Sequence, residues 1–153
     1  MKQRLIRVVD GHRIVFDQAT SKRMADIKTA GTKPELIARA VARALGLRFT
    51  TENRDLAGSP DLANRRRRWA VFVHGCYWHR HRGCPRATTP KRNRAFWHSK
   101  FEANCRRDTR VIAALRREGF SVCVLWECQI LRSRSNAATR LARLAHSRGN
   151  RDS

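Results

Sequence analysis

Residues 71–84 read VFVHGCYWHRHRGC, an apolar run followed at once by a loop of histidines, cysteines and two adjacent aromatic side chains. The apolar part, extended back to Trp69, has the length and composition of a buried strand that ends at His74. Thiols and imidazoles are common zinc ligands, and imidazoles also transfer protons near neutral pH. The stretch therefore predicts a strand that carries a metal-binding loop.

The chain around this strand predicts an α/β fold, in which helices cover both faces of a mixed sheet. Thr32, Pro34 and Glu35 are typical of a helix start, and Gly46 of a helix end. Apolar patterns and turn residues place the other elements. We expect a helix over 32–45, strands over 47–51, 61–63 and 69–74, a helix over 93–118 with at most one break, a strand over 120–126 and a last helix over 135–146.

The chain ends differ from this central region. Residues 1–20 resemble an accessory segment with a hairpin turn at Asp10-Gly11, and residues 21–31 a basic DNA-binding arm with little periodicity. We expect residues 32–147 to form the main domain and residues 148–153 to be a disordered tail.

Charge is the strongest compositional signal. The 153 residues hold 34 Lys and Arg against 12 Asp and Glu, a formal net charge of +22. Such a field favours a phosphate polymer as partner, although a ribosomal or histone-like protein would share it. No apolar run reaches the roughly 18 residues of a membrane span, and no signal-peptide core follows the first residues, so we expect a cytosolic protein without a membrane partner.

The five cysteines suit zinc better than disulfides, because their number is odd and a cytosolic compartment is reducing. Cys76, His81 and Cys84 have the spacing C-x4-H-x2-C. Cys128, just past the strand over 120–126, is the best candidate for the fourth ligand of a structural zinc site. Cys105 and Cys123 are expected to be small core residues. The alternative is that the loop cysteines are unligated thiols.

Asp61 and His74 predict a second site. Asp61 begins one strand and His74 ends the next, so antiparallel pairing can bring the two side chains together. A carboxylate beside a main-chain carbonyl suits Mg²⁺, and His74 or His79 could accept a proton from an attacking water. Pro60-Asp61 is also ordinary turn chemistry, so both interpretations stay open at this point.

A series of motifs resembles one known family. In chain order they are SKRM (21–24), TKPE (32–35), GSPD (58–61), VFVHGCYWH (71–79), FW (96–97), RRD (106–108) and VLWEC (124–128). They resemble the very short patch repair (Vsr) DNA mismatch endonucleases over about residues 21–130. The resemblance implies a restriction-endonuclease-like fold and Mg²⁺-dependent nicking 5′ to the thymine of a T·G mismatch, which arises when 5-methylcytosine deaminates.

The resemblance also implies residue roles in catalysis. Asp61 corresponds to the main magnesium ligand and Val73 to a position whose main-chain carbonyl contacts the ion, although the family often has Thr there. His79 corresponds to the general base, His74 to a histidine near the scissile phosphate, and Asp108 to an acid that supports His74.

Two further sets of residues follow from the resemblance. Glu35 corresponds to an active-site carboxylate, while its sequence context also suits a capping box. Cys76, His81, Cys84 and Cys128 match the family's zinc ligands. The gap between His81 and Cys84 is one residue longer than usual, and Gly83 is expected to accommodate it.

A mismatch can be sensed only by opening the base stack, which apolar wedges do at a cost of a few kcal/mol per step. Tyr77, Trp78 and Trp97 resemble the family's aromatic intercalators, and Met24 resembles a residue inserted from the minor-groove side. Packing against the helix core is the alternative for Trp97. We expect Trp69 and Trp126 to be core residues, and the turn 65–68, RRRR, to be either a solvated tip or a phosphate contact.

The sequence therefore predicts a DNA mismatch endonuclease that acts as a monomer on T·G duplexes. A cognate cytosine methyltransferase and mismatch-repair proteins are possible partners. Two alternatives remain: a restriction-type nuclease without mismatch preference, and a non-catalytic, zinc-stabilised nucleic-acid-binding protein.

Overall fold

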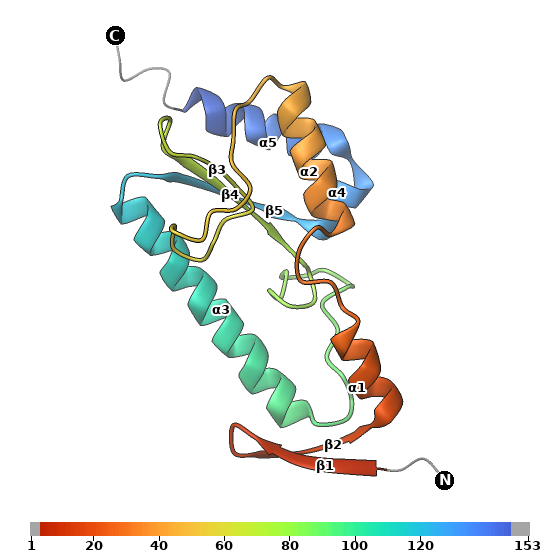
Figure 1. Cartoon of the computed structure of the whole chain (residues 1–153). Helices are drawn as coiled ribbons and strands as arrows, with labels where there is room; N and C mark the ends of the chain where they lie inside the picture. The colour runs from red at the N-terminus through yellow and green to blue at the C-terminus, as the bar shows by residue number, and fades with distance from the viewer. Residues whose placement is uncertain (1–3, 148–153) are drawn as a thin grey trace.

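A three-stranded mixed sheet lies at the centre of the computed structural model, which describes residues 4–147 (Figure 1). β4 pairs antiparallel with β3 on one side and parallel with β5 on the other. The strands are β3 (Leu62–Asn64), β4 (Trp69–His74) and β5 (Ser121–Trp126). The sheet has helices on both faces, which confirms the expected α/β class. The expected tail, residues 148–153, lies outside the described part of the chain.

The side chains of β4 alternate between two cores, as the two-residue period of a strand requires. Trp69 and Val71 pack in the core formed with α2 (Lys33–Ala44), α4 (Glu127–Arg132) and α5 (Arg134–His146). Ala70 and Phe72 face the opposite core, beneath α3 (Arg94–Arg117). His74 continues the second series, so the end of the strand brings this imidazole to the side of the sheet that α3 covers.

The parallel strands β4 and β5 are joined by α3, because parallel neighbours need a crossover connection. α3 is one unbroken helix of 24 residues, and it ends where Gly119 takes a φ of +85°. Its charged outer face points to solvent. Among residues 4–147, no helix combines the length and apolar character needed to cross a membrane.

α2 begins and ends where the sequence predicted. The Leu36 N–H donates to the Thr32 carbonyl at the first turn, and Gly46 follows the last turn with a φ of +71°. Ala38, Val41 and Ala42 are buried against the sheet. This helix places Glu35, on its first turn, at the edge of the sheet.

The described part of the chain begins with a β-hairpin. β1 (Arg4–Val9) and β2 (His12–Asp17) form a hairpin whose turn residues, Asp10 and Gly11, have φ values of +50° and +77°. These values suit a two-residue hairpin turn and confirm the predicted turn. The hairpin lies beside the start of α3 (Figure 1). The side-chain amide of Asn93 fixes it there, because it accepts from the Val15 N–H and donates to the Val15 carbonyl.

The expectation of an irregular arm over 21–31 is wrong for its first part. α1 (Gln18–Ala25) follows β2 directly, and the Asp17 carboxylate caps it by accepting the Thr20 N–H at 2.7 Å. The helix has no buried residue, so its sequence lacks the apolar face from which helices are usually predicted.

Two other segments differ from the prediction. Residues 47–51 are not a strand: Leu47 and Phe49 pack against the core, but only Thr50 pairs with the sheet, by a single bridge to Ala63. The alternating apolar residues there pack against the core, but the segment does not form the continuous hydrogen bonds of a strand with any neighbour. α4 was not predicted, because its six residues are too few to show helical periodicity.

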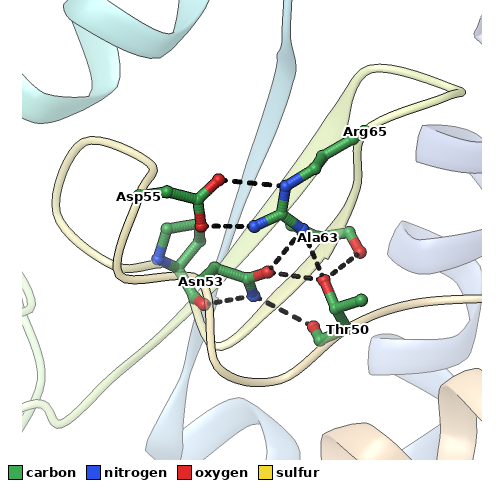
Figure 2. Close-up of polar contacts among 6 residues, drawn as sticks. Thr50, Asn53, Asp55, Ala63 and Arg65 are labelled. Atoms are coloured by element: carbon green, nitrogen blue, oxygen red, sulfur yellow. Dashed lines mark hydrogen bonds and ion pairs between the residues drawn. The ribbon is translucent and has the colours of Figure 1, made fainter.

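Asn53 fixes the loop between Thr50 and Asp61 (Figure 2). Its side chain is buried, and its amide nitrogen donates to the carbonyls of Thr50 and Pro60, each at 2.9 Å. Its amide oxygen accepts from the Thr50 hydroxyl and from Arg65. The carbonyl of the residue before Asp61 is therefore held in place by a buried side chain.

Replacing Asn53 by alanine is expected to lower the free energy of unfolding by about 1–3 kcal/mol, since the buried Pro60 carbonyl and the part-buried Thr50 carbonyl lose their donor. Urea unfolding measures the change. Asp55→Ala is the matched control: Asp55 pairs with Arg65 at the exposed edge of the same network, and such pairs contribute at most about 1 kcal/mol. Equal losses in the two variants would contradict the structural role assigned to Asn53.

Candidate active site and metal cluster

A cavity of about 220 Å³ opens where the end of β4 meets α3 and the start of α2. All the residues that the sequence suggested for catalysis line it: Glu35, Asp61, Val73, His74, His79 and Asp108. They come from four separate stretches of the chain, so the fold assembles a group that is dispersed in sequence.

Asp61 lies just before β3, beside the end of β4. Its Oδ2 accepts the Val73 N–H at 2.7 Å. Burial raises the pKa of Asp61 to about 6, and the charge of Glu35 also raises it, while the Val73 N–H acts in the opposite direction. A buried carboxylate that is costly to ionise is an environment in which a bound cation would be favourable.

The turn before Asp61 depends on one glycine. Gly58 has a φ of +71°, and a Cβ there would overlap the side chain of Val111 on α3. Ser59 also has a positive φ, of +49°. The loop thus passes close to α3 in a left-handed conformation and then delivers Pro60 and Asp61 to the cavity.

The two imidazoles of the cavity stack on each other. The rings of His74 and His79 are 3.8 Å apart between centroids and nearly parallel, at 7°. Burial lowers the pKa of His74 to about 4, and the neighbouring charge of His79 adds to the effect. His74 is therefore uncharged near neutral pH, and it offers the cavity a neutral ring.

α3 holds the loop that carries His79. Asp108 Oδ2 lies 2.6 Å from His79 Nδ1, Asn104 donates to the Trp78 carbonyl, and the Cys105 thiol contacts the His79 carbonyl. The resemblance implied that Asp108 supports His74, whereas its hydrogen bond is to His79. Cys105, expected to be a core residue, is half-buried and belongs to this contact instead. Because a carboxylate only accepts, Nδ1 carries a proton and donates it to Asp108.

Glu35 does not form a simple capping box with Thr32. Its carboxylate accepts from the Gly31 N–H at 2.8 Å and from the Thr32 hydroxyl at 3.0 Å. Thr32 therefore donates to Glu35 and does not cap the helix with its own side chain. Glu35 is buried, fixes the entry to α2 and lines the cavity at the same time.

A second group lies behind the loop. One ligand atom each from Cys76, His81, Cys84 and Cys128 falls within 4.8 Å of all the others. His81 Nδ1 is 3.6 Å from the Cys76 sulfur and 3.3 Å from that of Cys128. The set is therefore compatible with a metal site. Gly83 takes a left-handed φ of +73° between the ligand positions.

The thiols of this cluster differ in environment. Burial raises the pKa of Cys76 to about 12, while backbone N–H groups near Arg86 and Ala87 hold the pKa of Cys84 below its ordinary value. Cys128 is on the first turn of α4, and its N–H points at the Cys76 sulfur, 3.5 Å away. Cys123, in contrast, is buried in the core, as predicted.

A larger groove of about 860 Å³ adjoins the cavity. Its lining includes Met24 and the segment that follows α1, together with Tyr77, Trp78 and His79. Tyr77 and Trp78 pack edge to face at 5.0 Å. Trp97 of α3 lies against both rings, half-buried, and does not belong to either core. The aromatic residues predicted to contact DNA thus form one cluster at the groove.

Comparison with known proteins gives the family. A family model described as DNA mismatch endonuclease Vsr matches residues 14–86. A type II nicking enzyme of Xanthomonas oryzae pv. oryzae is 41% identical over 107 residues, covering 70% of this chain and 78% of the relative. A type II nicking enzyme of Neisseria meningitidis is 37% identical over 128 residues, covering 82% and 90%. The chain belongs to the Vsr family.

A further relative carries the family's own name. The DNA mismatch endonuclease Vsr of Escherichia coli is 36% identical over 117 residues, covering 76% of this chain and 74% of the relative. Membership of the Vsr family makes the protein a nuclease that acts on DNA. This excludes the non-catalytic alternative, and the strongly basic composition suits the substrate.

Two residues of this Vsr-family site were missed by sequence reasoning. Trp126, expected in the core, stacks on His81 at 4.3 Å and meets His74 edge-on at 5.4 Å, so it joins the metal cluster to the cavity. Glu127 accepts from the Cys76 N–H at 3.3 Å and pairs with Arg86. Their position beside Cys128 in the motif VLWEC was the available signal.

The arginine turn of the Vsr-family chain is partly structural. Arg65 pairs with Asp55 (Figure 2). Arg68 donates to the Glu118 carbonyl and lies over the Phe120 ring. Among the described residues of the turn, only Arg66 and Arg67 have exposed side chains without such contacts. These two arginines are therefore the ones to which either prediction, a solvated tip or a phosphate contact, can still apply.

Proposed function

We propose that this Vsr-family protein is a Mg²⁺-dependent endonuclease that nicks duplex DNA 5′ to the thymine of a T·G mismatch produced by deamination of 5-methylcytosine. The observation that supports it most is that Asp61, His74 and His79 line a single cavity. We also infer a restriction-endonuclease-like core, as the family implies. Because a T·G pair has no internal symmetry, we infer that one copy of the chain acts on each site.

Asp61 is the proposed magnesium ligand, with the Val73 carbonyl beside it. Oδ2 of Asp61 accepts the Val73 N–H, which orients the carboxylate that would coordinate the cation. The donor set fits, because Mg²⁺ takes few protein oxygens and keeps positions for water and phosphate. When bound, Mg²⁺ would polarise the scissile phosphate and lower the pKa of the attacking water. Glu35 supplies a second carboxylate to the same cavity.

His79 is the proposed general base. Its Nδ1 proton is held by Asp108, so Nε2 can take a proton from water while the carboxylate stabilises the resulting imidazolium. The water oxygen then bonds to phosphorus, and the bond from phosphorus to the 3′ oxygen breaks. After that oxygen takes up a proton, the products are a 5′-phosphate and a 3′-hydroxyl.

His74 is proposed to lie against the scissile phosphate. Its low pKa keeps the ring neutral, so it can donate one hydrogen bond without adding positive charge next to His79. The stack of the two rings fixes both orientations at once.

Recognition of the mismatch is assigned to the aromatic cluster. Tyr77, Trp78 and their neighbour Trp97 would enter the base stack. Met24, which lines the same groove as Tyr77 and Trp78, would enter from the minor-groove side. A T·G pair is opened more easily than a matched pair, so wedges of this kind favour it.

Replacing Trp78 by alanine is expected to reduce the ratio of affinities for T·G and T·A duplexes by about tenfold, since stacking on a base contributes about 1–3 kcal/mol. Dissociation constants measured without divalent metal on both duplexes give the ratio. Arg66→Ala is the control, because an exposed arginine of the 65–68 turn can act only through its charge and should affect both duplexes alike. Losses of the same factor on both duplexes in Trp78→Ala would make this side chain structural.

Zn²⁺ is the proposed occupant of the Cys/His cluster. Tetrahedral ligands at ordinary zinc distances place a sulfur about 3.5 Å from a nitrogen, and the sulfur to His81 Nδ1 distances are 3.6 and 3.3 Å. The metal would supply structural cross-linking rather than chemistry. Cys76 and His81 would then fix the loop that carries Tyr77, Trp78 and His79.

Mapping the product ends tests the proposal. Duplexes that carry T·G, other mispairs or T·A in varied flanks are labelled at both ends of each strand, and incubated with and without Mg²⁺. We expect one nick in the thymine strand of the T·G duplex, 5′ to that thymine, and only with Mg²⁺. Equal cutting of matched duplexes would favour a restriction-type nuclease without mismatch preference.

A further inference from the structure

Arg107 of α3 lines both the small cavity and the large groove next to it. Among the residues that line the cavity, it is the only lysine or arginine, whereas Glu35, Asp61 and Asp108 bring three carboxyl groups. A phosphodiester that enters such a cavity meets like charge from these groups. Among the cavity-lining residues, its guanidinium is therefore the one group that is always positively charged.

The side chain of Arg107 is exposed and uncommitted. No hydrogen bond or ion pair holds its guanidinium within residues 4–147. The neighbouring Arg106 is different, since it pairs with Glu102 one turn earlier on the same helix, at 2.5 Å. Arg39, the other arginine close to Asp61, is turned toward Glu35. Arg107 is thus available to a ligand, and its neighbours are not.

Its backbone, however, is fixed. Arg107 stands between Asn104, which holds the Trp78 carbonyl, and Asp108, which holds the His79 ring. A guanidinium is always charged, and its planar fork matches two oxygens of a phosphate group. The same helix turn therefore orients the general base and offers a bidentate anion donor beside it.

We propose that Arg107 is a further catalytic residue, which grips the non-bridging oxygens of the scissile phosphate and stabilises the charge that builds on them as water attacks. The inference rests on the proposed function, since it needs the cavity to be where phosphodiester hydrolysis occurs. It gives the cavity a positive group that does not depend on metal, and it predicts a loss in the chemical step rather than in overall binding.

Arg107→Gln and Arg106→Gln test it as a matched pair of adjacent substitutions. Single-turnover cleavage at saturating enzyme is measured on a duplex that the wild type cleaves, and the dissociation constant is measured without divalent metal. We expect Arg107→Gln to cleave about 10²–10³-fold more slowly with its dissociation constant changed less than about threefold. Arg106→Gln should behave like the wild type. Arg107→Lys should recover part of the rate, because it keeps the charge and loses the fork.

Three results would overturn the inference. They are a normal cleavage rate and normal binding in Arg107→Gln, an equal loss of rate in Arg106→Gln, or a larger dissociation constant for Arg107→Gln with a full cleavage rate at saturating enzyme. The last result would make Arg107 an ordinary contact to the DNA backbone. Unfolding midpoints and zinc content identify a misfolded variant, and Arg107→Lys then decides by its rate at saturation. If the wild type shows no preference for T·G, the mismatch proposal fails, yet the comparison of Arg107 with Arg106 can still be read.

Discussion

Replacing Asp61 by asparagine is expected to lower the rate of DNA cleavage by about 10³-fold or more, because a bound metal supplies several kcal/mol of transition-state stabilisation. The amide oxygen of asparagine can still accept the Val73 N–H, so the loop and β3 keep their positions. What is lost is the negative charge that would hold Mg²⁺. DNA binding without metal should stay close to that of the wild type.

Single-turnover cleavage of a T·G duplex measures this loss, and a second readout is thermal stabilisation by added Mg²⁺ or Ca²⁺, which should disappear in Asp61→Asn. Asp55→Asn is the control, since Asp55 is an exposed carboxylate of the preceding loop and pairs with Arg65. Unchanged cleavage in Asp61→Asn would remove this residue from the mechanism.

Replacing Cys84 by serine is expected to abolish stoichiometric zinc binding and to lower the unfolding midpoint by about 10 °C or more, since structural zinc contributes several kcal/mol to folding. Cleavage should fall with it, because the loop between Cys76 and Cys84 carries His79, Tyr77 and Trp78. A chelator should reproduce both effects in the wild type.

Elemental analysis and thermal unfolding of Cys84→Ser and Cys123→Ala provide the comparison. Cys123 is a buried core thiol outside the cluster, so its alanine variant should lose some stability and keep one zinc per chain. A wild-type preparation that is fully active without metal in the cluster would contradict the ligand assignment.

Sequence reasoning was most accurate where a short stretch showed a strand pattern together with side chains that bind metals or transfer protons. The antiparallel step from the strand over 61–63 to the strand over 69–74 predicted that Asp61 and His74 would lie close together, and both line one cavity. The spacing of Cys76, His81 and Cys84, with Cys128 past the next strand, predicted a cluster that the structure brings together.

Other features could not be predicted because they depend on tertiary contacts. The hydrogen bond from His79 to Asp108 depends on the angle at which α3 passes the loop, which no spacing encodes. Leu47 and Phe49 alternate like a strand because the core buries them, although they have no partner strand. Arg107 and Arg106 are adjacent and chemically identical in the sequence, and only the fold gives one of them to the cavity.

The single-turnover rate of nicking on a T·G duplex, compared with a T·A duplex of the same flanks, tests the central claim most directly. With Mg²⁺ we expect the mispaired thymine strand to be cut about 10²-fold faster, since opening a mispair costs a few kcal/mol less than opening a matched pair, and no cutting in a metal chelator. Equal rates on the two duplexes, or undiminished cutting without divalent metal, would contradict the account.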